Sequence, residues 1–148
     1  MLKKEIKYVD FNDQEQVDTF YFNLNKTEML NFQIGKEGGL EGSIRFLTET
    51  NNSKEVMDVF TEIVKSSVGM KSADGKTFIK SEEITNNFIQ SPAFDELFFD
   101  LLKDANKMAE FISGIMPKDI RPTKEQYDAE IKKLEAKYNV NTTSQENG

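Results

Sequence analysis

The sequence of 148 residues contains no cysteine, no histidine and no tryptophan. Without cysteine, the chain can form no disulfide framework and has no thiol nucleophile and no thiolate ligand for a metal ion. Without histidine, it lacks the commonest general base and the usual nitrogen ligand of zinc. These absences disfavour an enzyme and a metalloprotein. We expect no catalytic residues, no metal site and no cofactor.

Long apolar runs and a basic surface are also missing. No stretch approaches the roughly 18 apolar residues of a membrane-spanning helix, and the start Met1–Lys7 lacks the apolar segment of a signal peptide. The formal net charge is −7. Nucleic-acid phosphates are bound by clustered basic side chains, which this acidic chain does not show. We therefore expect a cytoplasmic protein that binds neither nucleic acid nor membrane.

Hydrophobic residues make up 37% of the chain, and 12 residues are phenylalanine. This composition predicts a folded domain with an aromatic core. We predict an α+β, predominantly α-helical fold, with an N-terminal β-hairpin packed on a bundle of about five short helices and a C-terminal amphipathic helix. The predicted domain covers residues 1–120, with the hairpin at 3–24 and the helical body at 25–116. Residues 121–148 are predicted to form the C-terminal helix and a disordered tail.

Two alternating runs predict the hairpin. The first surrounds Ile6 and Tyr8, the second spans Val17–Leu24, and the polar segment Asp10–Glu15 separates them. This segment has acidic and amide residues at some positions of a calcium loop, but it has no central glycine and no glutamate at the required offset. We interpret it as the hairpin turn.

Three consecutive aromatic residues end the second run. Phe20 and Phe22 share one face of a strand, and Tyr21 points to the other. We assign the two phenylalanines to the core. An amphipathic ring is useful at an interface, so Tyr21 is a candidate partner-binding residue.

Capping and turn residues divide the helical body. Asn25 and Glu28 form a capping box, and Ser81 and Asp104 cap later helices. A short helix is also expected at residues 40–48.

Gly69 stands where a helix C-terminus favours a left-handed residue. The Asp74-Gly75 pair predicts a tight turn, after which residues 77–79 form a short extended run that pairs back as a small hairpin. We interpret the segment from Gly69 to Ser81 as the joint between two helical halves.

Three carboxylates, Asp95, Glu96 and Asp100, lie close together on one predicted helix. Paired acids serve glycoside hydrolysis or magnesium binding when they converge in a cleft. Helical spacing instead places them opposite the apolar face of Phe94 and Leu97. We interpret them as a solvated face.

The C-terminal segment carries a narrow apolar stripe formed by Tyr127, Ile131, Leu134 and Tyr138. Their spacing of four, three and four residues is that of a helical seam, so they are candidate partner-binding residues and a candidate contact for a homo-oligomer. Two heptads are fewer than the three or four that indicate a coiled coil. A surface helix docked on its own domain is the simpler alternative, and both stay open.

Four segments follow one another in a characteristic order: Phe20–Leu24 in the hairpin, Gly38–Leu40 at a helix start, Val68–Ser81 at the joint and Phe111–Pro117 at a helix end. In this order they resemble the small tail assembly chaperones of long-tailed phages and prophages of Gram-positive bacteria. The resemblance covers about residues 3–120.

The resemblance implies a non-enzymatic assembly factor of the host cytoplasm. Such a chaperone binds the tape measure protein, keeps it soluble and helps recruit tail-tube protein during tail assembly. Two alternatives remain from other classes: a structural component of the virion head or tail, and a small phage effector that binds a host protein.

Overall fold

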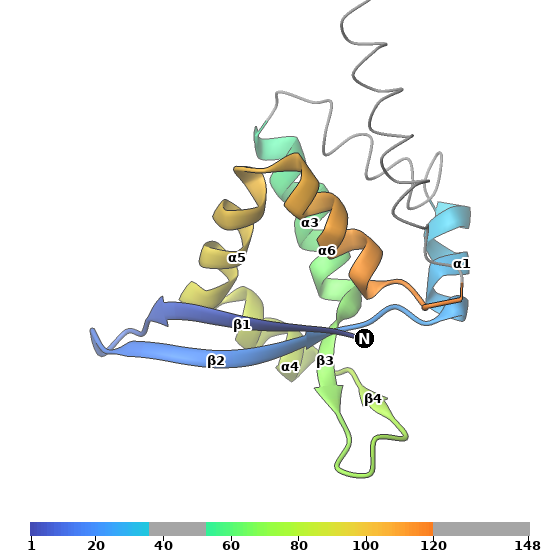
Figure 1. Cartoon of the computed structure of the whole chain (residues 1–148), viewed down its shortest axis with the longest axis horizontal. Helices are drawn as coiled ribbons and strands as arrows, with labels where there is room; N and C mark the ends of the chain where they lie inside the picture. Colours follow the sequence, from blue (N-terminus) through green and yellow to red (C-terminus); the bar gives the residue numbers. More distant parts are fainter. Residues whose placement is uncertain (36–52, 120–148) are drawn as a thin grey trace, which may run out of the picture.

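The computed structural model describes residues 1–35 and 53–119. In chain order the described elements are β1 (Leu2–Val9), β2 (Glu15–Phe22), α1 (Lys26–Gly35), α3 (Ser53–Ser67), β3 (Val68–Lys71), β4 (Phe78–Ile79), α4 (Glu82–Ile89), α5 (Pro92–Leu102) and α6 (Ala105–Ile115). Figure 1 shows the β1–β2 hairpin below α5 and α6, and the β3–β4 arm projecting away from α3, α5 and α6.

The N-terminal hairpin forms because its two strands each alternate between an inward and an outward face. The strands pair in antiparallel register from Leu2 opposite Phe22 to Val9 opposite Glu15. Among the inward residues Ile6 and Phe22 are buried in the core, while the outward residues of β1 are exposed. The predicted hairpin is therefore confirmed.

The predicted architecture around the hairpin was wrong, although the chain is α+β. The hairpin is not a separate unit on a helical bundle, because β3 and β4 extend it to a four-stranded antiparallel sheet of order β1-β2-β3-β4. Tyr21 pairs with Gly69 and Phe22 with Val68. The predicted helices at 40–48 and 121–148 lie outside the described residues.

The error arose where α3 becomes β3. Helix α3 ends at Ser67 and the strand begins at the next residue, with no loop between them. The Ser67 carbonyl already accepts a hydrogen bond from the backbone N–H of Asn23, at 2.8 Å, so the sheet ladder begins where the helix ends. Gly69 is thus a strand residue and not a left-handed helix cap, and the positive φ of 74° belongs to Gly75 in the following turn.

The core is a chain of phenylalanine rings that joins the sheet to the helices. Phe22 of β2 lies 5.5 Å from Phe88 of α4 and 5.2 Å from Phe111 of α6, measured between ring centroids. Phe111 in turn lies 5.7 Å from Phe60 of α3, and Phe60 contacts Phe98 of α5. Edge-to-face and tilted ring contacts of this kind add to the free energy of apolar burial. The aromatic core expected from the sequence is confirmed.

The predicted helix caps are also observed. The Asn25 side chain accepts from the Glu28 N–H at 2.8 Å, and the Glu28 carboxylate accepts from the Asn25 N–H at 3.0 Å. Ser81 and Asp104 each accept a hydrogen bond from a backbone N–H in the first turn of α4 and α6. These contacts satisfy N–H groups that have no partner within the helix.

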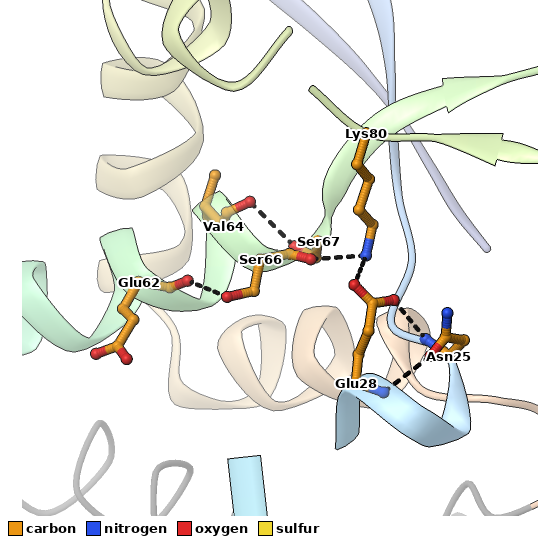
Figure 2. Close-up of polar contacts among 7 residues, drawn as sticks. All are labelled: Asn25, Glu28, Glu62, Val64, Ser66, Ser67 and Lys80. Atoms are coloured by element: carbon orange, nitrogen blue, oxygen red, sulfur yellow. Dashed lines mark hydrogen bonds and ion pairs between the residues drawn. The ribbon is translucent and has the colours of Figure 1, made fainter. Parts of the chain in front are cut away.

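Lys80, which directly follows β4, connects the joint to α1 and α3, as Figure 2 shows. Its ammonium group donates to the Glu28 carboxylate of α1 and, at 2.7 Å, to the backbone carbonyl of Ser66 in α3. The side chains of Lys80 and Glu28 are only 23% and 31% exposed. Glu28 therefore caps α1 through one oxygen and binds Lys80 through the other.

Replacing Lys80 by methionine should destabilise this joint. In Lys80→Met one oxygen of the Glu28 carboxylate and the Ser66 carbonyl lose the ammonium donor while they stay largely shielded from water. We expect the free energy of unfolding to fall by about 1 to 3 kcal/mol, measured by urea denaturation.

The matched control is Lys107→Met. Lys107 pairs with Asp100 at 3.4 Å, but these side chains are 52% and 54% exposed. Breaking so exposed a pair should change the stability by less than about 1 kcal/mol. An effect of Lys80→Met no larger than that of the control would contradict the role assigned to Lys80.

Candidate partner-binding site

The two faces of the sheet have different surroundings. Inward side chains such as Ile6 are buried beneath the helices. The outward residues of β1, which include Lys3 and Lys7, are exposed, and within residues 1–35 and 53–119 no helix covers them. The outer face and the ends of the two hairpins are thus the accessible surface of the described sheet.

Three apolar side chains are exposed at the end of the first hairpin. Phe11, in the turn, is 84% exposed, and Val9 and Val17 are about half exposed. Val9 lies opposite Glu15 and Val17 opposite Lys7, so the two valines are diagonal neighbours on the outer face. We call Val9, Phe11 and Val17 the tip cluster.

A hydrogen-bonded turn holds the tip cluster in place. The Asp10 carboxylate accepts from the backbone N–H groups of Asn12 and Gln14, at 2.8 and 3.0 Å, and from the Gln16 side-chain amide at 2.8 Å. Asp13 completes the turn with a φ of 60°. The hydrogen bond from Gln16 and those from the backbone hold the pKa of the Asp10 carboxyl below its ordinary value.

A second exposed apolar pair lies on the β3–β4 arm. Met70 and Ile79 are directly opposite each other, and both are exposed. The turn beyond them is closed by Asp74, whose carboxylate accepts from the Ser72 hydroxyl at 2.7 Å and from the Lys76 N–H at 3.0 Å. We call Met70 and Ile79 the arm pair. The small hairpin expected here from the sequence is confirmed.

Tyr21 lies at the base of both hairpins, on the outer face, where it pairs with Lys3 on one side and Gly69 on the other. The Phe78 ring packs directly against Gly69, because a Cβ atom at Gly69 would come within 2.5 Å of a ring carbon. Tyr21 and Phe78 thus flank the glycine on one face. They form a half-buried aromatic surface on the same face as Val9 and Val17, whereas the arm pair, one residue further along its strands, lies on the opposite face.

Exposed apolar residues on hairpin ends suit protein binding. A comparison with known families identifies the family of this chain. A family model described as "Phage tail assembly chaperone" matches residues 1–147. The chain belongs to the phage tail assembly chaperones. The match extends beyond residue 120, where the resemblance of the four sequence segments ends. No match to the chaperone was found among curated proteins or among solved structures.

The residues predicted for partner binding in the chaperone fall in two places. Tyr21 lies on the outer face described above, half-buried and next to Gly69. The stripe of Tyr127, Ile131, Leu134 and Tyr138 lies outside the described residues and stays a prediction.

The tip cluster and the arm pair were not predicted from the sequence. A signal for the first was present, because Phe11 stands alone among polar residues in a predicted turn, where no core position is available. The arm pair had no comparable signal, since Met70 and Ile79 become neighbours only through the pairing of β3 with β4.

Acidic residues of the chaperone do not converge in the described part of the chain. Asp95, Glu96 and Asp100 are exposed on α5, as the helical spacing predicted. Across residues 1–35 and 53–119, no group of three acidic side chains is placed to hold a metal ion. None of the helices described there is long and apolar enough to cross a membrane.

The turn that holds the tip cluster should respond to acid. Because the pKa of Asp10 is lowered in the folded chaperone, its contribution to stability is present above the unfolded pKa and is lost as the pH falls through the folded pKa. In an NMR titration we expect the Asn12 and Gln14 amide signals to shift together, with a midpoint below the ordinary value for aspartate.

Asp10→Asn is the control for this titration, because an amide has no carboxyl proton to gain. The shift of the two amide signals should vanish in this variant. A midpoint at or above the ordinary aspartate value in the unchanged chaperone would contradict the assigned hydrogen bonds.

Proposed function

We propose that this tail assembly chaperone binds the tape measure protein, keeps it soluble in the host cytoplasm and helps recruit tail-tube subunits. Membership of the chaperone family supports a non-enzymatic role in tail assembly. The observation that best supports client binding is the tip cluster, where Phe11 is 84% exposed on a turn fixed by Asp10.

Burial of the tip cluster supplies a driving force for binding. Covering a large apolar side chain contributes about 1.5 to 3 kcal/mol. The turn is already ordered by the hydrogen bonds of Asp10, so little conformational entropy is lost when a client covers Phe11. A few such contacts give an affinity that holds a client in solution and still permits its release during assembly.

The arrangement of the exposed residues favours an elongated client. The tip cluster lies at the end of the β1–β2 hairpin, and the arm pair lies on the separate β3–β4 arm (Figure 1). A helical client with an apolar stripe contacts the tip cluster and Tyr21, which share the outer face, while the arm pair offers a second apolar contact on the opposite face. We propose that Tyr127, Ile131, Leu134 and Tyr138 supply a further apolar stripe for the same client.

Co-expression with the tape measure protein tests the proposal. The unchanged chaperone should increase the soluble fraction of the tape measure protein and elute with it. The double variant Phe11→Ser with Val17→Thr should reduce both the soluble fraction and the co-elution, because it removes most apolar surface of the tip cluster. Both positions are exposed, so the fold should be retained.

Met57→Ser is the matched control, since Met57 is an exposed apolar residue of α3 that lies outside both hairpins. We expect it to behave like the unchanged chaperone. If the unchanged chaperone has no effect on the tape measure protein, the proposed function is wrong. If the tip variant and the Met57 variant act alike, the tip cluster is not the binding site.

A further inference from the structure

The outer edge of β1 has no partner in the described part of the chain. β1 is the first strand of the sheet order and is eight residues long. The N–H and C=O groups of successive residues point alternately to the two edges of an antiparallel strand. The Asp10 N–H donates to the Gln14 carbonyl, so even-numbered residues direct these groups toward β2. Odd-numbered residues of β1 therefore direct their backbone groups away from β2. The bond from Asn23 to Ser67 supports this pattern, because it shows odd-numbered residues of β2 turned toward β3.

The exposed side chains along this edge alternate in charge. Lys3, Glu5 and Lys7 are the outward residues, followed by Val9. A lysine-rich edge usually prevents unspecific pairing with other strands. Here Glu5 lies between the two lysines, so a pairing strand with the complementary order of charges is accepted. We propose that this strand is β1 of a second copy of the chain, paired in antiparallel orientation.

Charge selects one register for this pairing. A two-fold axis at Glu5 places two glutamates opposite each other and Lys3 opposite Lys7, which is destabilising. An axis at Lys4 also places Lys3 opposite Glu5 twice, but it brings two lysines together at the closest type of pair, where the Cα atoms are about 4.5 Å apart. An axis at Ile6 places Glu5 opposite Lys7 twice. In this register Ile6 of one copy lies opposite Ile6 of the other, so no like charges are paired at the axis.

The helix above β1 provides a second observation. α5 packs on β1, and it leaves Phe99 and Leu102 exposed. These residues are three positions apart and so lie on one side of the helix. Pairing of two β1 strands leaves both copies of α5 covering the same face of the joined sheet.

The pairing gives the dimer a defined shape. Because the two β1 strands run in opposite directions, the two tip clusters lie at opposite ends of one continuous sheet. A dimer would contact an elongated client at two separated points, which raises the overall affinity. This consequence depends on the proposed function, whereas the pairing itself does not.

Charge reversal tests the pairing with the full-length chaperone alone. E5K places lysine opposite lysine, and K7E places glutamate opposite glutamate, at two symmetric positions each. We expect each variant to weaken dimerisation by about tenfold or more at low salt, measured by sedimentation equilibrium. Circular dichroism melting checks that both variants are folded.

Two recovery experiments make the test specific for this register. An equimolar mixture of E5K and K7E should form a heterodimer, because each lysine then lies opposite a glutamate. The double variant E5K/K7E should recover the homodimer for the same reason. A monomeric unchanged chaperone, single variants that associate normally, or failure of both recoveries would overturn the proposal. Because no client is present, these outcomes are independent of the co-expression result.

Discussion

Phe22 and the two residues that follow it bind the sheet to the ends of two helices. Phe22 pairs with Val68 at the start of β3. Asn23 donates its N–H to Ser67 at the end of α3, and Leu24 donates to Ile115 at the end of α6, both at 2.8 Å. The side chains of Phe22 and Leu24 are fully buried. The rest of the described fold depends on this segment, because it fixes both hairpins to one core.

That buried base explains how the chaperone can expose apolar residues without losing its fold. The tip cluster and the arm pair lie at the outer ends of hairpins whose inner ends are packed, hydrogen-bonded and, at Lys80, joined to α1 and α3. Exposed residues such as Phe11 contribute little to the core, so they are available for binding. The residues that stabilise the fold and the exposed apolar residues are thus different residues of the same hairpins.

Local signals in the sequence predicted much of the fold and little of the site. The capping box at Asn25, the Gly75 turn and the inward face of Phe22 were predictable because each depends on neighbouring residues. The pairing of β2 with β3 was not, because it joins distant segments through a short ladder that includes Gly69. A glycine after a helix suggests a cap, and only the Phe78 ring and the Ile79 carbonyl packed against it explain the glycine in a strand.

Site-specific photo-crosslinking tests directly whether the tip cluster binds the tape measure protein. A photoreactive residue placed at position 11 reports on the tip cluster, and one at position 57 reports on exposed α3. We predict crosslinks to the tape measure protein from position 11 and none above background from position 57. Crosslinking from position 57 without any from position 11 would show that the client binds elsewhere and would contradict the account.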